Sequence, residues 1–438
     1  MNRRPHRAAT GIALILACLT SAAGAAGLSD AEQRVVKAAS AETPRAIELL
    51  ETMVNINSGS LNPEGVKRVA DVMRTQLEPL GFKVEWIPMT QVGRAGHLIA
   101  RHEGTGDRKG KRILLIGHMD TVFEPDSPFQ KFIRKGDTAE GPGVNDMKDG
   151  LAIMVSALRA MKTAGTLAPA HITIVLSGDE ESPGKPVETS RRDMRAAAAV
   201  SDVALEFESL AQEDGKDMGS TARRGFTSWR LVVSAKSGHS SGMFSDSAGY
   251  GAIYELSRIL DTFRREAREP NATFNVGMIA GGTSAKLEAG ADSASSSGKS
   301  NIIPATAIAT GDLRTLSIEQ TRRVGQKMQT IVAQHLGGAN AEIVFEDEYP
   351  AMAPTEGNRR VLALLNGVNR DLRLPPMGEL DPLKRGAGDI AFVADKVDAL
   401  VGFGAAGHGA HAPGETVDLT SFDRQIKRAA LLMGRLSN

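Results

Sequence analysis

Short apolar runs alternate with longer amphipathic stretches in both outer parts of this chain. The runs "RILLIG" (112–117), "ITIVLS" (172–177), "VALEF" (203–207) and "ALVGFG" (399–404) have the length and composition of buried strands. Helical patterns lie between them, as in residues 147–162, where apolar residues recur at steps of three and four. This order predicts an α/β fold whose mixed, mostly parallel sheet carries helices on both faces.

The pattern changes between residues 220 and 349. Strand-like and amphipathic helical stretches follow one another there, with strands at 227–235, 305–314 and 341–349 and helices at 250–268 and 317–336. A set of this size predicts a small α+β sandwich inserted into a larger domain, which residues 26–219 and 350–438 form together. Residues 281–300 within it are rich in Gly, Ser and Ala, and they predict a long mobile loop.

The first 25 residues are typical of an export signal. Arg3, Arg4 and Arg7 precede an apolar run that is too short to span a bilayer, and small residues follow at 23–25. Residues 1–25 therefore predict a signal peptide and a secreted or periplasmic protein without stable membrane insertion. Cys18 lies within this segment, and whether it carries a lipid is left open.

Composition narrows the chemistry that the mature chain is able to perform. The sequence has 52 basic and 52 acidic residues among 438, so no excess charge favours nucleic acid or an anionic membrane surface. Because the one cysteine lies in the signal segment, the mature chain has no disulfide, thiolate metal site or cysteine nucleophile. Small molecules are the expected partners, and a metal site must use His, Asp and Glu side chains.

Polar side chains follow the four apolar runs in turn: His118 and Asp120, then Asp179, Glu180 and Glu181, then Glu208, then His408 and His411. Asp146 lies on a Gly-rich loop before the helical stretch at 147–162. Because sites in open α/β sheets form beyond the carboxyl ends of the strands, these groups are able to converge. Two histidines and three carboxylates suit Zn²⁺, and a shared carboxylate is able to hold two ions. The pattern predicts a two-metal hydrolase.

Each of these residues also has a simpler interpretation. A histidine after a strand is more often a packing or surface residue, Asp146 is suited to capping a helix, and the acids at 179–181 are typical of a solvated turn. On composition alone, His408 and His411 are equal candidates. The coincidence of four strand ends, each bearing a His or a Glu, favours the metal site.

Five motifs in one order give the chain a family resemblance. "LLIGHMDTVF", "GPGVNDMKDG", "SGDEESPG", "LEFES" and "GHGAHAPGE" resemble the successive metal-site motifs of the co-catalytic zinc aminoacylase and carboxypeptidase family, which includes glutamate carboxypeptidase and succinyl-diaminopimelate desuccinylase. The likeness runs from about Ala46 to the C-terminus. It implies a catalytic domain interrupted by a lid domain, and two Zn²⁺ per chain, with Co²⁺ or Mn²⁺ as substitutes.

The resemblance also implies which residues bind the ions: one zinc is held by His118 and Glu208, the other by Glu181 and His411, and both by Asp146. In the family a cis peptide bond often follows the shared aspartate, here Asp146. His411 is preferred to His408 because it stands four residues before Glu415, which is the family's usual spacing.

A mechanism follows from the same resemblance. Glu180 would take a proton from a water held by the ions and return it to the leaving amine, while Asp120 orients the imidazole of His118. His239 of the lid would stabilise the oxyanion, although a surface-loop histidine is the simpler alternative. The remaining residues would line the site or bind the substrate's α-carboxylate: Asn301, Arg314, and Gly386, Gly388 and Asp389 of a Gly-rich loop.

We therefore expect an exported di-zinc carboxypeptidase that releases a C-terminal amino acid, with glutamate as the first choice, from an N-acyl, peptide or folate-like substrate with a free α-carboxylate. An aminoacylase or dipeptidase would share the zinc machinery, and an exported solute-binding protein is the non-enzymatic alternative. The helix at 250–268 predicts either a homodimer contact through the lid or packing on the lid's own sheet. The Ser-rich run before "NIIP" leaves the substrate open.

Overall fold

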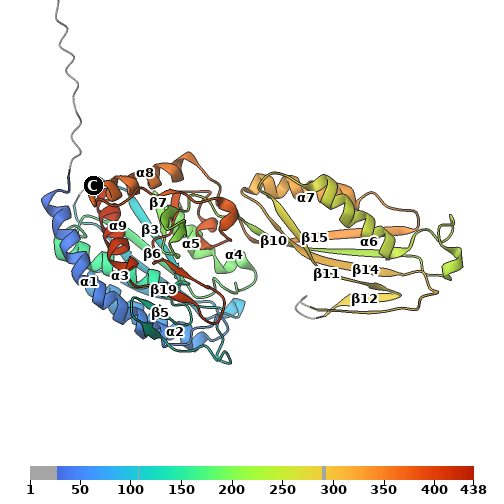
Figure 1. Cartoon of the computed structure of the whole chain (residues 1–438), viewed down its shortest axis with the longest axis horizontal. Helices are drawn as coiled ribbons and strands as arrows, with labels where there is room; N and C mark the ends of the chain where they lie inside the picture. The colour runs from blue at the N-terminus through green and yellow to red at the C-terminus, as the bar shows by residue number, and fades with distance from the viewer. Residues whose placement is uncertain (1–26, 107, 289–292) are drawn as a thin grey trace, which may run out of the picture.

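The computed structural model describes residues 27–106, 108–288 and 293–438, so the predicted signal peptide with Cys18 lies outside the described residues. Among the helices it describes, none combines the length and apolar character that crossing a bilayer requires. Figure 1 shows two parts, a main body formed by both outer segments of the chain and an elongated inserted domain that extends from it.

The main body is built on a six-stranded sheet. In spatial order its strands are β1 (Lys83–Pro88), β2 (Gly96–His102), β6 (His171–Ser177), β3 (Arg112–His118), β7 (Val203–Glu206) and β17 (Asp398–Val401). β2 is antiparallel to β1 and β6, whereas β6, β3, β7 and β17 pair in parallel. The mixed, mostly parallel sheet predicted from the apolar runs is confirmed.

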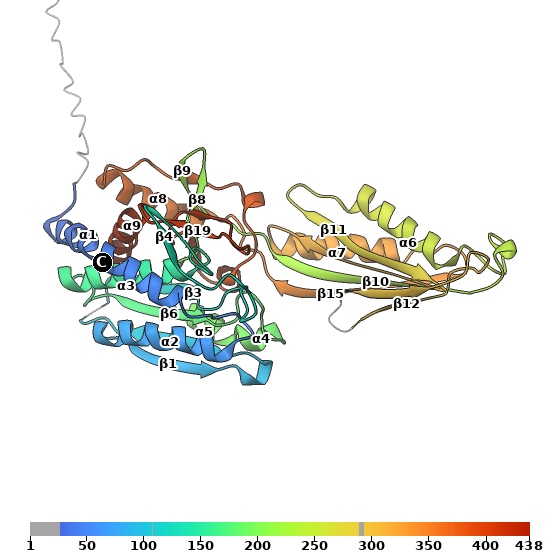
Figure 2. The ribbon, with the colours of Figure 1, turned by 60° about the horizontal axis from the view of Figure 1, so that its bottom comes forward.

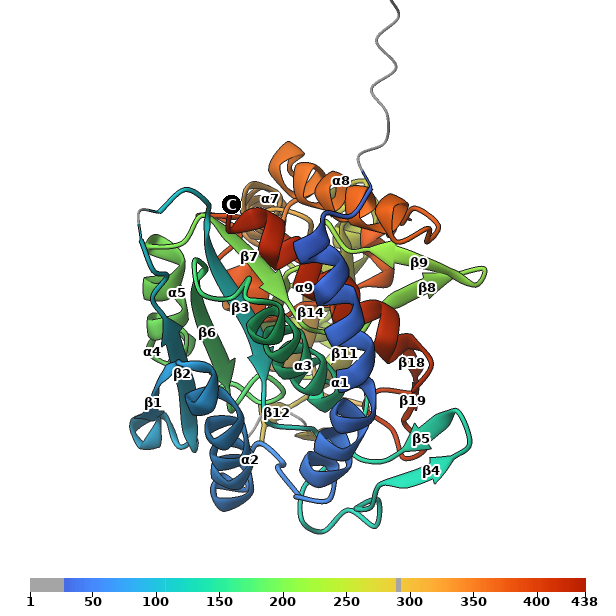
Figure 3. The ribbon, with the colours of Figure 1, turned by 90° about the vertical axis from the view of Figure 1, so that its left-hand side faces the viewer.

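Helices cover both faces of this sheet because successive strand residues point to opposite sides. Ile113 and Leu115 of β3 face one core, and Leu114 and Ile116 face another. The first core is completed by α1 (Asp30–Val54), α2 (Pro63–Leu77), α3 (Lys148–Ala164), α8 (Glu356–Asp371) and α9 (Ser421–Leu436). The second is covered by α4 (Val187–Ser190) and α5 (Arg192–Ala199), as Figure 3 shows.

Two small sheets extend the main body. One consists of β8 (Ala211–Glu213), β9 (Lys216–Gly219) and β16 (Gly378–Glu379), and the other of β4 (Ile133–Lys135), β5 (Thr138–Glu140), β19 (Thr416–Asp418) and β18 (Gly407–His408). Single 3₁₀ turns occur at Glu78–Leu80, Thr90–Val92, Ser240–Gly242, Pro382–Lys384 and Asp389–Phe392. The β18–β19 turn matters most for function, because it carries His411.

The inserted domain has an antiparallel sheet in the order β11 (Thr273–Gly282), β14 (Thr306–Arg314), β10 (Phe226–Ala235) and β15 (Ala339–Tyr349). Two helices, α6 (Gly251–Thr262) and α7 (Ile318–Val332), pack on this sheet around Trp229, Leu231 and Met328. A π-helical turn at Phe263–Ala267 follows α6, so the helix predicted at 250–268 is α-helical only in its first part. Figures 1 and 2 show both helices running along the sheet.

The prediction of a long mobile loop at 281–300 is wrong for the residues on either side of 289–292, and those four lie outside the described residues. β11 extends to Gly282, and β12 (Ser284–Leu287) pairs antiparallel with β13 (Ala294–Ser297). The small side chains allow this hairpin to lie close to β11, because a Cβ on Gly282 would stand only 2.3 Å from the carbonyl oxygen of Ser297. The Gly and Ser content here reflects close strand packing, which composition alone does not distinguish from a loop.

Two adjacent strands connect the inserted domain to the main body. Phe226, the first residue of β10, pairs with Tyr349, the last residue of β15. Beyond this pair, the backbone N–H groups of Arg223 and Met352 each donate to the other's carbonyl oxygen at 3.0 Å. The connection is a two-stranded ribbon, which we call the hinge (residues 223–226 and 349–352).

Candidate metal centre

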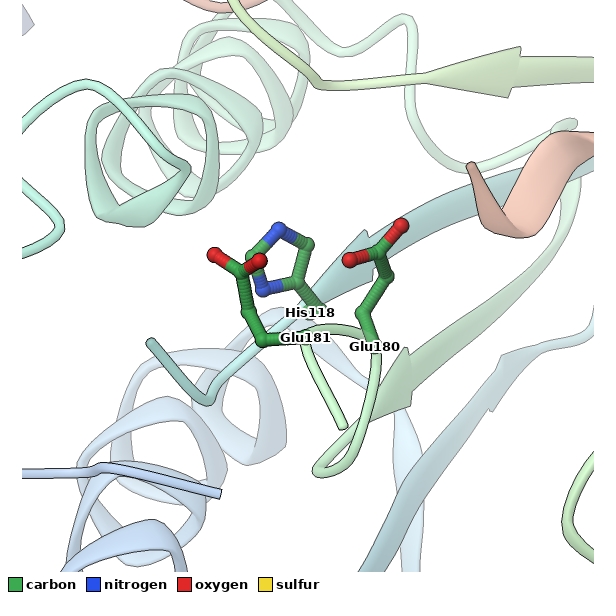
Figure 4. Close-up of side chains that lie close together, drawn as sticks. All are labelled: His118, Glu180 and Glu181. Atoms are coloured by element: carbon green, nitrogen blue, oxygen red, sulfur yellow. The ribbon is translucent and has the colours of Figure 1, made fainter. Parts of the chain in front are cut away.

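Six side chains from five separate chain segments gather at the carboxyl ends of the parallel strands. They end or follow β3, β6 and β7, precede α3, or lie between β18 and β19: His118, Glu180, Glu181, Glu208, Asp146 and His411. Figure 4 shows Glu180 and Glu181 rising from the loop after β6 beside the imidazole of His118 at the end of β3. The polar residues that follow the apolar runs in the sequence are therefore brought together in the structure.

Asp146 joins two groups of donor atoms. Its Oδ1 lies 3.1 Å from Nε2 of His118, and Oε1 of Glu208 lies 3.5 Å from the same nitrogen. Its Oδ2 lies 3.0 Å from Nε2 of His411, which is 3.1 Å from Oε2 of Glu181. Within each group, donor atoms of three residues lie within 4.8 Å of one another. The five predicted ligands thus form two sets that share one carboxylate.

This donor set fits divalent cations. Oε1 of Glu181 is buried and has no hydrogen-bond partner among the described residues, so it offers an unused lone pair. Among the protein groups alone, burial and then repulsion by Asp146 raise the pKa of Glu181 to about 7. Carboxylates and imidazoles are the ligands that Zn²⁺ takes where thiolates are absent. A pair of ions would also offset the concentration of negative charge.

The raised pKa of Glu181 favours its neutral form, whereas the raised pKa values of the two histidines favour their charged form. Hydrogen bonds to Asp146 and Glu181 raise the pKa of His411 to about 11. Burial disfavours the charged form of His118, but its hydrogen bonds to Asp120, Asp146 and Glu208 raise its pKa well above the usual value. Because a metal ligates neutral imidazole, binding must displace a proton from each ring.

Asp120 is buried beneath the metal centre and contacts several of the residues that form it. Nδ1 of His118 lies 3.1 Å from the backbone carbonyl oxygen of Asp120 and 3.4 Å from its Oδ1, so both groups of Asp120 orient the ring. The same carboxylate accepts the backbone N–H groups of Glu180 and Glu181, each at 3.0 Å, and the hydroxyl of Ser60 at 2.6 Å. Burial raises the pKa of Glu180 well above its usual value, which suits a group that must accept a proton near neutral pH.

Glu415 holds the loop that carries the shared aspartate. Its Oε1 accepts the N–H groups of Asn145 and Asp146 at 2.7 and 2.9 Å. The peptide bond after Asp146 is cis, as the family resemblance implies. A third donor cluster consists of His118, Glu180 and Glu181, and His408 takes part in none of the three found among the described residues. The spacing between His411 and Glu415 favoured His411 over His408 in the sequence, but it gave no indication of what Glu415 contacts.

Two arginines beside Glu208 have no role predicted from the sequence, although Arg385 directly precedes the predicted Gly-rich loop. Nη2 of Arg385 lies 3.5 Å from Oε2 of Glu208, and Nη1 of Arg223 lies 3.8 Å from its Oε1. Part of the predicted Gly-rich loop supports this arrangement. The carbonyl of Gly386 accepts Nε–H of Arg223 at 2.8 Å, and a Cβ on Gly388 would come within 2.1 Å of its Nη1. Gly386 therefore binds Arg223 through its carbonyl, and Gly388 leaves space for the guanidinium.

No contact described for the inserted domain joins its predicted substrate residues to the metal centre. His239 is exposed in the turn after β10, and Ser240 donates its N–H to the carbonyl of Asn301 at 3.0 Å, which places Asn301 beside it. Arg314 ends β14 near the hinge, with its guanidinium 5.0 Å from the ring of Phe226. Since ten residues of strand span roughly 30 Å, His239 and Arg314 lie at opposite ends of the inserted sheet.

A model of the peptidase family M20/M25/M40 matches residues 114–435, which is well over half of the chain. The chain belongs to this family. Among curated M20 relatives, carboxypeptidase G2 of Pseudomonas sp. (strain RS-16) is 27% identical over 440 residues, which cover 98% of this chain and 98% of that protein. The region matched includes each of the candidate metal ligands.

Solved structures agree on the M20 fold. A tripeptidase of Staphylococcus aureus has a TM-score of 0.71 and 17% identity, covering 90% of this chain and 98% of that one. A dinuclear metal-binding M20 peptidase of Bacillus subtilis has a TM-score of 0.61 and 15% identity, covering 91% and 99%. The catalytic class follows from family membership: this is an M20 peptidase-family hydrolase with a candidate metal site of His, Asp and Glu residues.

Proposed function

We propose that this protein is an exported di-zinc carboxypeptidase that hydrolyses an amide bond and releases a C-terminal glutamate from an N-acyl, peptide or folate-like substrate. The observation that carries the proposal is the position of Asp146, whose two oxygens each face a different histidine at 3.0–3.1 Å. The similarity to carboxypeptidase G2 along nearly the whole chain supports the carboxypeptidase type.

His118, Asp146 and Glu208 would hold one zinc, and Asp146, Glu181 and His411 the other. When bound, the pair would polarise the scissile carbonyl and make a water acidic enough to attack it. Glu180 also lies in a third donor cluster, with His118 and Glu181, and we assign to its carboxylate the proton of the attacking water, which it would take and then return to the leaving amine. Asp120 keeps His118 and the Glu180 loop in place during these steps.

The inserted domain would supply the substrate contacts. Arg314 has the planar guanidinium suited to an α-carboxylate, and His239 and Asn301 form a second polar group at the distal end of the sheet. Dimerisation through the inserted domain is part of the proposal, because isoleucine and tyrosine side chains of α6, Ile253 and Tyr254, are exposed. Export rests on the N-terminal signal pattern.

The test is hydrolysis of a substrate panel by metal-free protein to which Zn²⁺ is added back. The panel contains N-acyl glutamates, folate, dipeptides, and N-acyl derivatives of neutral amino acids. We expect activity that requires about two zinc ions per chain and the highest kcat/KM with a glutamate leaving residue. Faster release of neutral residues would overturn the glutamate assignment and favour an aminoacylase or dipeptidase. A protein that binds substrate analogues without zinc or hydrolysis would instead be a solute-binding protein.

A further inference from the structure

Tyr349 links the hinge to the loop of the proposed base. It is the last residue of β15, the strand that returns from the inserted domain, and its backbone pairs with Phe226. Its side chain is buried, with 8% exposed, and lies in the main body against Phe392, with ring centroids 5.0 Å apart. The residue therefore belongs to one domain by its strand and to the other by its packing.

The phenol of Tyr349 contacts the backbone between the two functional glutamates. Its hydroxyl donates to the carbonyl oxygen of Glu180 at 2.7 Å. That carbonyl shares a peptide plane with the N–H of Glu181, which donates to Asp120 at 3.0 Å. The plane joining the proposed base to a proposed zinc ligand is thus held from both sides, by Tyr349 and by Asp120.

A buried arginine fixes the hydroxyl of Tyr349. Nη2 of Arg191 donates to this hydroxyl at 3.0 Å, so the phenol proton is directed to the Glu180 carbonyl. Arg191 is itself anchored by Asp179 at 2.6 Å and by Asp389 at 2.7 Å, and all three side chains are at most 2% exposed. Burial raises the pKa of Tyr349 well above its usual value, so the phenol stays a donor across the working pH range.

We propose that Tyr349 is a positioning residue for the reaction: through the Glu180 carbonyl it fixes both the base and its neighbouring zinc ligand, and it connects them to the hinge strand. The inference rests on the proposed function, because it assigns Tyr349 a part in the same hydrolysis. A loosened peptide plane would displace two side chains at once, and displacements near 1 Å are enough to lower rates by about a hundredfold.

The variant Tyr349→Phe removes the hydroxyl and keeps the ring against Phe392. We expect kcat to fall by about ten- to a hundredfold with KM changed less than about twofold, and the zinc affinity of the metal-free protein to fall by about tenfold. Tyr250→Phe, which alters an exposed phenol immediately before α6, is the matched control and should leave both values unchanged. Wild-type values of kcat and zinc affinity in Tyr349→Phe would overturn the proposal.

A double-mutant cycle separates positioning from general support of the fold. Glu180→Asp shortens the base, so removing the Tyr349 hydroxyl in that background should lower kcat by less than it does in the wild type. Fully additive losses would mean that Tyr349 does not act through Glu180, and would also overturn the proposal. Zinc affinity, measured by competition with a chelator, needs no substrate. If the wild type hydrolyses nothing in the panel but Tyr349→Phe still binds zinc more weakly, the proposed function fails while the positioning of Glu181 stands.

Discussion

The two domains of this chain carry their candidate chemistry in different ways. In the main body, the proposed ligands and base lie in a dense network, in which Asp120 alone contacts His118, Glu180 and Glu181. In the inserted domain, His239 and Asn301 are exposed on two adjacent segments, after β10 and before β14, and Arg314 lies at the other end of the same sheet. Preorganisation is therefore built into one domain, whereas the substrate contacts that we propose for the other would require hinge bending or a second copy of the chain.

Metal removal should produce the largest effect and should be confined to the main body. A chelator is expected to abolish hydrolysis and to lower the free energy of unfolding, since an ion at a thousand times its Kd contributes about 4 kcal/mol. Hydrogen exchange should rise in the segments that carry the ligands, around His118, Asp146, Glu181 and His411, and stay unchanged in the inserted sheet. Equal changes in both domains would contradict the division described above.

Glu180→Gln should have the next largest effect, because it removes the proton acceptor without removing a ligand. We expect kcat to fall by about 10²- to 10⁴-fold while about two zinc ions remain bound. Glu181→Gln should instead lose zinc affinity, and Glu188→Gln, an exposed change on α4, should behave as the wild type. Metal analysis beside steady-state kinetics distinguishes the three. Full activity in the zinc-loaded Glu180→Gln variant would remove Glu180 from the role of base.

Much of the main body could be predicted from local patterns. The apolar runs at β3, β6 and β7 are followed at once by His118, Glu181 and Glu208, so strand, strand end and ligand lie within a few residues of one another. Parallel pairing then brings the strand ends together, which requires only the α/β order of elements.

The groups that support the centre could not be predicted in this way. Tyr349 contacts Glu180 across 169 residues, and Asn145 contacts Glu415 across 270. Such contacts leave no periodicity or spacing in the sequence. The hairpin of β12 and β13 was missed for a different reason: its Ser and Ala residues, beside Gly282, allow close strand packing, but the same residues are typical of loops.

His239→Ala tests whether the inserted domain takes part in the reaction. Loss of an oxyanion donor is expected to lower kcat by about a hundredfold or more with zinc content unchanged. Mixing this variant with Glu180→Gln shows which copy supplies the histidine, because recovered activity would require a site shared between two chains. If the two inactive variants stay inactive together, hinge bending within one chain is the remaining route. Unchanged kcat in His239→Ala would leave His239 as a surface-loop residue.

The smallest effect on activity is expected from ion pairs that stabilise the main body away from the metal centre. Asp217 of β9 pairs with Arg424 at 2.9 Å and with the buried Arg428 of α9 at 2.6 Å. Although burial opposes it, these bonds lower the pKa of Asp217 to about 2 from its ordinary 3.8. Because the folded pKa is lowered, the pair's contribution is complete above about pH 4 and is lost as the pH falls toward 2.

Asp217→Asn should therefore lower the free energy of unfolding by about 2 kcal/mol at pH 7, with kcat unchanged. Asp261→Asn is the matched change in the inserted domain, where the aspartate pairs with Arg264 and Arg265 on the surface, and it should cost less because solvent screens those pairs. Urea unfolding between pH 7 and pH 2 measures both, and the gap between wild type and Asp217→Asn should close with acid. A gap that stays constant would show that the packing of Asp217, and not its charge, stabilises the main body.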